Sequence, residues 1–391
     1  MNLSRLIFCH ACVCIVALAL ALGAPVGCSA TVTTNDRCAA PIRLLPDASL
    51  RISQLAMSVG CSCARMSDGS VRCMGNNLTG CLGVQNLPYA SNPIRVPGVS
   101  GVIDVAINTF GTVCALTNSG DVWCWGWDGN GLVGNDHAGD DLCAGRVMCA
   151  HAPVRLPAIR DAIKIVVGEL SVCVIRADRR VMCWGDIEFS SAGAPFRVAH
   201  PVEIPGIADA VSLFPSGRSV AIVRSDGSVD SVDSNARVQI PLTASVSGSG
   251  PTGRYCYVRE DRQAYCWGEN EFSVLGTDVG GTPIRMPRLL GVPCVSDISV
   301  GFRHSCAIVT DGHVMCWGAN ESQQVGPVSQ NSANCGISRC VTTPFLVSGV
   351  DHVVSVSLSD GRTCAIRSDH TVWCWGMVNG ESTHTPTRVE W

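Results

Sequence analysis

The chain has 391 residues, of which 47% are hydrophobic, 15% charged and 5% aromatic, and its formal net charge is −4. This apolar content excludes a disordered chain, and the absence of a basic run argues against nucleic-acid binding, which needs a clustered positive surface. The 24 cysteines indicate an oxidising compartment.

Residues 1–27 predict a secretory signal peptide. Arg5 supplies the positive charge, and the uncharged apolar stretch Leu6–Leu22 follows it. The stretch is shorter than the ~20 apolar residues of a membrane-spanning helix, and Gly23 and Pro25 end it before small residues. We therefore expect an extracytoplasmic protein, secreted or attached to a bacterial cell envelope.

Cys28 has two interpretations. Val26-Gly27-Cys28 resembles a bacterial lipoprotein box, in which the cysteine becomes lipid-modified, although Pro25 stands where such boxes usually have leucine. The alternative is ordinary cleavage near Ala30. In both cases we expect residues 28–40 to be a linker and residues 41–391 to form one domain.

A repeat is visible in the spacing of the cysteines. Six pairs share an interval of ten residues: Cys63/Cys73, Cys114/Cys124, Cys173/Cys183, Cys256/Cys266, Cys306/Cys316 and Cys364/Cys374. Between the cysteines, Asp is common at the fifth position, Gly at the sixth and Val at the eighth, and Trp-Gly usually follows the second cysteine. A seventh copy has Ala221 and Ser231 at the two cysteine positions, so both partners are absent together.

The joint loss of both cysteines is expected for a bonded pair, because a lone partner would leave a free thiol. Apolar and polar residues alternate around the Asp-Gly centre, which predicts a β-hairpin with a three-residue loop. Such a loop closes with a residue in the left-handed region, where glycine is favoured. The cysteines then face each other across two strands, so we predict six hairpin disulfides. Buried reduced thiols are the alternative, and the spacing does not match a zinc knuckle.

The seven copies follow one another at intervals of roughly 50 residues, and repeats of about this length made of short strands and turns are typical of propeller blades. We predict an all-β fold, a seven-bladed β-propeller of four-stranded antiparallel blades. Pro41-Ile42-Arg43 matches a repeat tail without its head, and the last copy ends at Trp391. We therefore expect the ring to close where the two terminal segments meet, with each end part-way through a unit.

The heads, clearest in CALTNSGDVWCWG (114–126), resemble the regulator-of-chromosome-condensation repeat, and the tail HAPVRLPAIRDAIKIVVG (151–168) matches its second half. The resemblance covers roughly residues 41–391 and implies a seven-bladed propeller. The founding nuclear member binds chromatin and drives nucleotide exchange on a small GTPase, which we do not expect of an exported acidic chain. Exported bacterial members look closer, including a β-lactamase inhibitor protein that covers its target with one propeller face. Gly-x-Leu-Gly segments are weak in copies three, four and seven.

Copies two and six carry insertions at the same place, NDHAGDDLCAGRVMCAHA (135–152) and PVSQNSANCGISRCVTT (327–343). Each contains a cysteine pair, Cys143/Cys149 and Cys335/Cys340, which we predict to form a local disulfide that stiffens a polar loop. Equivalent positions of a repeat project from the same face, so we expect these loops to border a partner surface. The candidate residues are Asp140, Asp141, Arg146, Asn334 and Arg339. The alternative is an insertion without a partner.

Cys38, Cys61, Cys81 and Cys294 remain. A bond between Cys61 and Cys81 is one option, but sequence alone assigns no connectivity. His151 lies near two cysteines of the first insertion, but a metal there would lack a fourth ligand, so we favour the disulfide.

We found no sequence motif for catalysis. GSGPTG (248–253) fits G-x-G-x-x-G but leads into a predicted strand instead of a helix. We predict no catalytic residue, cofactor or metal, and a monomeric, non-enzymatic scaffold that binds a protein or a glycan through propeller-face loops. A membrane would be contacted only through a lipid anchor at Cys28. The alternatives are a secreted inhibitor of another enzyme and an enzyme with a site at the propeller axis.

Overall fold

The computed structural model describes Cys38 and the chain from residue 51 to residue 391, with internal gaps. The gaps are residues 137–140, 144–146, 188–195, 217–218, 231–237, 241–244, 250–252, 278–280, 328–331, 336–337 and 379–380. The predicted signal peptide, Cys28, Asp140 and Arg146 therefore lie outside the described residues. Within the described ranges, no helix has the length and apolar composition that crossing a membrane requires.

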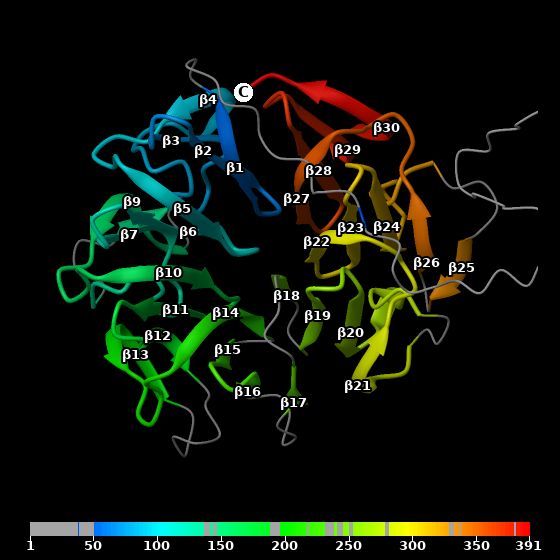
Figure 1. The fold of residues 1–391 in the computed structure, drawn as a ribbon. Coiled ribbons are helices and arrows are strands. Elements are labelled where there is room, and N and C mark those ends of the chain that lie inside the picture. The colour runs from blue at the N-terminus through cyan, green and yellow to red at the C-terminus, as the bar shows by residue number, and fades with distance from the viewer. Residues whose placement is uncertain are drawn as a thin grey trace, which may run out of the picture. The chain divides into compact units, whose positions relative to one another are not determined.

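Seven antiparallel sheets form the blades of a propeller (Figure 1). Blade 1 contains β1 (Ile52–Met57), β2 (Cys61–Met66), β3 (Val71–Asn76) and β4 (Tyr89–Arg95). Blade 2 contains β5 (Val102–Ile107), β6 (Thr112–Thr117), β7 (Val122–Trp127), β8 (Asp141–Cys143) and β9 (Val147–Arg155). Blade 3 contains β10 (Ala162–Val167), β11 (Ser171–Arg176), β12 (Val181–Ile187) and β13 (Phe196–Glu203).

The second half of the ring continues in chain order. Blade 4 contains β14 (Ala210–Ser216), β15 (Ser219–Arg224), β16 (Ser228–Asp230) and β17 (Val238–Gln239). Blade 5 contains β18 (Ser245–Ser249), β19 (Arg254–Val258), β20 (Ala264–Gly268), the short helix η1 (Glu271–Ser273) and β21 (Ile284–Leu289). Blade 6 contains β22 (Val295–Val300), β23 (His304–Val309), β24 (Val314–Ala319), β25 (Ser332–Cys335) and β26 (Ser338–Leu346), and blade 7 contains β27 (Val353–Ser359), β28 (Arg362–Arg367), β29 (Val372–Val378) and β30 (Glu381–Val389).

The disulfide-linked hairpins are present as predicted. In blade 1 Cys63 pairs directly with Cys73 across β2 and β3, with 4.1 Å between the Cα atoms. The same register and bond recur in five other blades, at Cys114–Cys124, Cys173–Cys183, Cys256–Cys266, Cys306–Cys316 and Cys364–Cys374. Each sulfur pair is buried and therefore belongs to the core between the blades.

The hairpin turns have the predicted left-handed residue at the sixth position. Gly69 has φ of +75° there, and three blades place Arg179, Arg262 and His370 at φ of +66° to +68°. The aspartate before this residue shapes the turn, because its carboxylate accepts the backbone N–H two residues further on. This bond occurs in six turns, from Asp68, Asp178, Asp226, Asp261, Asp311 and Asp369.

The ring closes where blade 7 meets blade 1. Ser357 donates a 2.5 Å hydrogen bond to the carbonyl of Leu55, and Arg51 donates one of 3.0 Å to the carbonyl of Asp369. A shared apolar cluster joins the two blades and includes Ile52, Leu55, Met57, Ala64, Met66, Cys364, Ile366, Val372 and Cys374. The expectation that the chain ends part-way through a structural unit was wrong for the described strands. Blades 1 and 7 each consist of four consecutive strands, so packing closes the ring without strand exchange.

The described parts of the two insertions form strands, where we expected loops. In blade 2, β8 pairs with the start of β9, and in blade 6, β25 pairs with the start of β26, so each insertion adds a fifth strand at the outer edge. The two predicted disulfides, Cys143–Cys149 and Cys335–Cys340, lie within these hairpins. Backbone pairing explains the difference, because an edge strand satisfies N–H and C=O groups that a loop leaves to solvent.

The four remaining paired cysteines form two further bonds. Cys61 bonds Cys81 within blade 1, which was the option considered from sequence, and Cys38 bonds Cys294 between blades 5 and 6. The second bond joins residues separated by 256 positions. It therefore links Cys38, which precedes β1, to the connection between β21 and β22.

Candidate functional site

The propeller has two faces, and one carries the turns from the first to the second strand of each blade. We call this the β1–β2 face, and the cysteine hairpin turns lie on the opposite face. At the mouth of the ring axis the β1–β2 face has a cavity of about 110 Å³. Six blades contribute to its lining, among them blade 3 with Glu169 and blade 7 with Asp360.

Glu169 and Asp360 form an acidic pair at the axis. Burial raises the pKa of Glu169, the charge of Asp360 raises it further, and a 2.6 Å hydrogen bond donated by Thr109 opposes both effects. Burial also raises the pKa of Asp360, against the positive charge of Arg303. Carboxyl groups in such surroundings hold protons at higher pH than exposed ones.

A second feature of this face is a loop that fills the seam between neighbouring blades. It follows the third strand of blades 1, 2, 5 and 6, and in each case a buried Asn or Asp oxygen accepts the N–H five residues on. These bonds join Asn77 to Leu82, Asp128 to Val133, Asn270 to Leu275 and Asn320 to Val325, at 2.6–3.0 Å. The loop therefore has a fixed conformation, and its aliphatic side chains are buried.

In three seams the tryptophan of the next blade completes this packing. Trp125, Trp184 and Trp317 are fully buried, and each indole N–H donates to a carbonyl of the preceding blade's loop, at 2.7–2.9 Å. The Trp-Gly motif recognised in the sequence thus serves contact between blades. Its glycine is needed as well, because a Cβ on Gly126 would overlap the carbonyl oxygen of Gly111.

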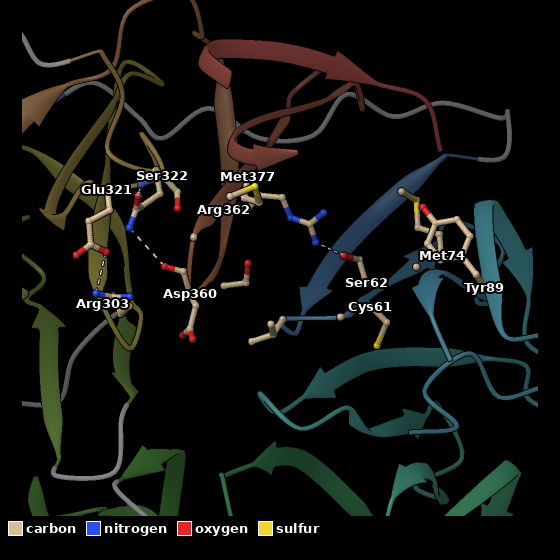
Figure 2. Close-up of a pocket in the computed structure, with 16 residues that line it drawn as sticks. Cys61, Ser62, Met74, Tyr89, Arg303, Glu321, Ser322, Asp360, Arg362 and Met377 are labelled. Atoms are coloured by element: carbon tan, nitrogen blue, oxygen red, sulfur yellow. Dashed lines mark hydrogen bonds and ion pairs between the residues drawn. The ribbon is translucent and has the colours of Figure 1, made fainter. Parts of the chain in front are cut away.

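The seam between blades 7 and 1 lacks both partners of this packing. Residues 379–380 alone separate β29 from β30, and Val378 stands where the other loops have Asn or Asp. On the other side of the seam, blade 1 has Met74 in place of tryptophan. A cleft of about 360 Å³ lies at this seam, and blades 1, 6 and 7 line it (Figure 2). We call it the 7–1 cleft.

Of the two arginines that line the 7–1 cleft, Arg303 has an acidic partner, whereas Arg362 has none among the described residues. Arg303 forms a 2.8 Å ion pair with Glu321, donates to Ser338 at 3.1 Å and lies over the ring of Phe272. Arg362 extends towards blade 1 and donates a 2.7 Å hydrogen bond to Ser62 (Figure 2). Among the described residues, no ion pair involves Arg362, and burial lowers its pKa.

Arg254 occupies the position of Arg362 in another blade. Each is the first residue of the second strand and pairs with the glycine of Trp-Gly, Gly268 in blade 5 and Gly376 in blade 7. The Arg254 side chain is fully buried, and its guanidinium forms a 3.0 Å ion pair with Glu271 of the same blade's seam loop. Blade 7 has no such loop, so Arg362 lacks the corresponding carboxylate.

Exposed apolar side chains gather on the β1–β2 face of blades 7, 1 and 2. They are Met377, Val59, Leu78, Tyr89, Phe110, Leu142 and Met148, with 37–62% of each residue exposed. Three of them, Met377, Val59 and Tyr89, line the 7–1 cleft. Other exposed apolar residues, such as Ile103 and Ile163, lie at the opposite end of their strands.

The insertions contribute to the rim of this face. Asn334 and Arg339 are both exposed and face each other across β25 and β26, and Asp141 opens β8. Leu142 and Met148 of the blade 2 insertion were not predicted as surface residues. Whether any of these positions contacts a partner stays a prediction.

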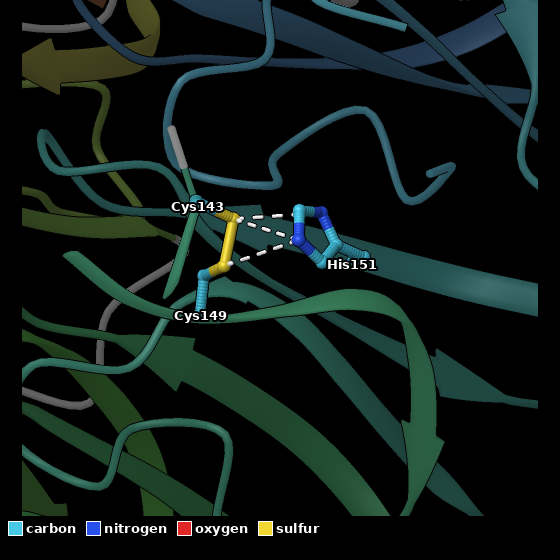
Figure 3. Close-up of side chains that lie close together, drawn as sticks. All are labelled: Cys143, Cys149 and His151. Atoms are coloured by element: carbon cyan, nitrogen blue, oxygen red, sulfur yellow. Dashed lines mark hydrogen bonds between the residues drawn. A yellow bond between two sulfur atoms is a disulfide. The ribbon is translucent and has the colours of Figure 1, made fainter. Parts of the chain in front are cut away.

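His151 lies beside the Cys143–Cys149 disulfide (Figure 3). Its Nδ1 is 3.5 Å from the sulfur of Cys143, and its Nε2 is 3.9 Å from the sulfur of Cys149. A cysteine sulfur binds a metal ion as a free thiolate. Here the two sulfurs are bonded to each other, so neither is a thiolate. The geometry therefore favours the disulfide over a metal centre.

Sequence reasoning missed the 7–1 cleft, although its two signals are visible in the chain. Met74 replaces tryptophan in the first copy, and the seam loop is absent from the last copy. Neither change alone indicates a cleft. Only the closed ring makes them two sides of one seam.

Comparison with known proteins supports the repeat assignment. Three segments match the family model of the Regulator of chromosome condensation (RCC1) repeat, at residues 102–132, 295–324 and 353–381. The crystal structure of Prp20p from Saccharomyces cerevisiae, described with its binding to Gsp1p and histones, superimposes with a TM-score of 0.66 at 17% identity and covers 88% of both chains. Prp20 bound to Kap60 gives the same TM-score. These likenesses show the fold.

Two sequence relatives are much longer than the region that they share with this chain. Protein pim1 of Schizosaccharomyces pombe is 27% identical over 149 residues, which is 32% of this chain and 28% of pim1. The human E3 ubiquitin-protein ligase HERC2 is 23% identical over 340 residues, which is 84% of this chain and 6% of HERC2. The chain thus spans less than a third of either relative.

Proposed function

We propose that the chain is a non-enzymatic scaffold that binds a protein partner with its β1–β2 face. The observation that carries this proposal is the gathering of seven exposed apolar side chains on one face of three adjacent blades. Val59 is 62% exposed and Tyr89 56%. Exposed apolar side chains that gather beside a cleft are typical of protein-binding surfaces.

The similar proteins support a protein partner over a glycan. Prp20 forms complexes with proteins, as its structures with Kap60 and its binding to Gsp1p and histones indicate. We carry over only the capacity to bind proteins. Nucleotide exchange and ubiquitin transfer are not part of the proposal, because a likeness to Prp20 at 17% identity shows only the fold, and the chain spans 28% of pim1 and 6% of HERC2.

The proposal includes an extracytoplasmic location, with the chain secreted or held by a lipid at Cys28. Ten disulfides among the described cysteines support it, because such bonds persist in oxidising compartments. The apolar signal-like segment at the start of the sequence supports it as well.

Comparative capture by surface variants tests the binding face. Purified mature protein would be incubated with native envelope extract, and bound proteins identified by mass spectrometry. We expect capture to be lost in Val59→Asp and Phe110→Asp, which place a charge on the β1–β2 face. Ile103→Asp and Ile163→Asp are matched controls, since both residues are about half exposed at the other end of their strands. Equal capture by all four variants would contradict the proposal.

The acidic pair at the axis favours an enzyme as the second candidate. Glu169 and Asp360 have raised pKa values, and a protonated carboxyl group can act as a general acid. A hydrolytic activity that co-purifies with the protein and disappears in Asp360→Asn would favour this candidate. An inhibitor of another enzyme would use the same face as the scaffold, and the identity of the captured protein would reveal it.

A further inference from the structure

We propose that the 7–1 cleft receives a short segment of the partner protein, which supplies a carboxylate to Arg362 and an aliphatic side chain to the space beside Met74. This inference rests on the proposed protein-binding function and gives it a specific determinant. The occupant is a polypeptide that takes the place of the seam loop missing from blade 7.

Blade 5 shows the interaction that blade 7 lacks. Arg254 and Arg362 have the same register, opposite the glycine that follows tryptophan. The carboxylate of Glu271, two residues before Ser273 in the seam loop, pairs with Arg254 at 3.0 Å. In blade 7 only residues 379–380 lie between β29 and β30, so no seam loop of this blade supplies a carboxylate to Arg362.

The state of Arg362 makes an anionic ligand favourable. Among the described contacts, the hydroxyl of Ser62 at 2.7 Å is the one hydrogen-bond partner of the Arg362 guanidinium, and this acceptor is neutral. A guanidinium has five N–H donors and prefers a carboxylate, which can accept two of them side by side. Since Arg362 is partly withdrawn from water, an incoming carboxylate gains more there than at an exposed arginine.

The other charges of the cleft direct the carboxylate to Arg362. Arg303 is already paired with Glu321 and packed on Phe272. Asp360 lines the blade 6 side of the cleft, where its charge disfavours a second carboxylate. An acidic side chain is therefore best placed at the Ser62 end, between blades 7 and 1.

The apolar part of the ligand follows from the other seams. Seam loops bury an aliphatic side chain against the next blade, such as Leu82, Leu132 or Leu275. At the 7–1 seam Met74, which is smaller, replaces tryptophan. Met377 and Tyr89 are exposed and line the cleft. A ligand of about 360 Å³ corresponds to a few side chains, which suits a short peptide segment. A neutral glycan would leave Arg362 without a charged partner.

A peptide copy of the blade 5 seam loop provides the probe. The capped peptide Glu-Asn-Glu-Phe-Ser-Val-Leu-Gly, from residues 269–276, would be titrated into the full mature protein labelled at methionine methyl groups. We expect NMR shifts at Met74 and Met377, which line the cleft, and none at Met286, which is 67% exposed on β21.

Two substitutions test the role of the carboxylate pair. Arg362→Met should weaken peptide binding by roughly tenfold or more, the usual effect of losing a charged hydrogen bond, and Arg362→Lys should retain part of it. Arg285→Gln, an exposed arginine on β21, should leave binding unchanged. A peptide with glutamine at the position of Glu271 should bind the wild-type protein as weakly as the original peptide binds the Arg362→Met protein. This change is in the peptide and cannot affect folding of the protein.

Absence of binding to the wild-type protein, equal binding of the glutamine peptide, or shifts away from both cleft methionines would overturn the proposal. The native partner separates this failure from failure of the proposed function. If Arg362→Met captures the partner normally while Val59→Asp and Phe110→Asp do not, the face binds the partner without a carboxylate at Arg362. If all three variants capture it normally, the binding face itself is wrong.

Discussion

Nε2 of His304 lies 2.7 Å from Oγ1 of Thr363, across the seam between blades 6 and 7, and both residues are completely buried. The hydroxyl of Thr363 in turn donates to the carbonyl of Gln324, so its oxygen accepts a hydrogen bond from the imidazole Nε2–H. Burial lowers the pKa of His304 to about 3, and the neighbouring charge of Arg303 contributes. The histidine is therefore neutral in the folded protein and takes part in joining two blades.

This neutral histidine predicts a loss of stability in acid. Below the unfolded pKa of about 6.5 the unfolded chain binds a proton that folded His304 does not, so the free energy of unfolding falls as pH decreases towards 3. The contribution is about 1.4 kcal/mol for each pH unit in that window. His304→Gln should show a shallower decline between pH 6.5 and 4 in urea unfolding.

Replacing the left-handed turn residues by glycine should stabilise the hairpins. Arg179, Arg262 and His370 hold φ near +67°, a conformation that costs a residue with a Cβ about 1 kcal/mol relative to glycine. Arg262→Gly is the cleanest case and should raise the free energy of unfolding by a few tenths to ~1 kcal/mol. Gly120→Ala makes the opposite change at the same position, and its Cβ would also overlap the carbonyl oxygen of Arg160. A fall in stability for Arg262→Gly would contradict this account.

The hairpin disulfides should act as pairs. Cys114→Ala with Cys124→Ala removes one short loop closure and should lower the free energy of unfolding by ~2–3 kcal/mol. The single change Cys114→Ala should cost at least as much, since it breaks the same bond and leaves a buried thiol at Cys124. Blade 4 shows that the hairpin survives without the bond, because Ile222 still pairs with Asp230 next to Ala221. Strictly additive single changes would contradict the pairing.

Local features were predictable from the sequence because they depend on residues close in the chain. Cys63 and Cys73 face each other because of the two-residue period of the strands and the length of the turn. Asp178 and Arg179 form a turn that depends on no other blade. The same reasoning could not find the 7–1 cleft. Met74 and Val378 become neighbours of one seam only after the ring closes, so neither departure from the repeat indicates a cleft when it is considered alone.

Long-range pairing and edge-strand formation were also beyond sequence reasoning. The bond between Cys38 and Cys294 depends on where the segment before β1 passes, which no repeat pattern encodes. The insertions of blades 2 and 6 were expected as loops because they are polar. They pair as fifth strands because the outer strands β9 and β26 offer free backbone groups at that edge.

The acidic pair at the axis predicts that stability falls as pH rises past the unfolded pKa values, which are 3.8 for Asp360 and 4.5 for Glu169. Burial raises the pKa of Glu169 and of Asp360, and the charge of Asp360 adds to the effect at Glu169. Below the unfolded pKa both carboxyls are protonated in the folded and the unfolded chain. As pH rises, the unfolded chain ionises first, so the free energy of unfolding declines until the folded pKa is passed.

Removing the charge at either position should reverse this decline. Glu169→Gln keeps an oxygen that accepts the hydrogen bond from Thr109, and it should be more stable than wild type at pH 7 but not at pH 4. Asp360→Asn should behave in the same way. Because the two charges repel each other, the double variant should gain less at pH 7 than the sum of the single gains, as a double-mutant cycle of urea unfolding would measure. Additive gains would mean that the two carboxyl groups at the ring centre do not interact.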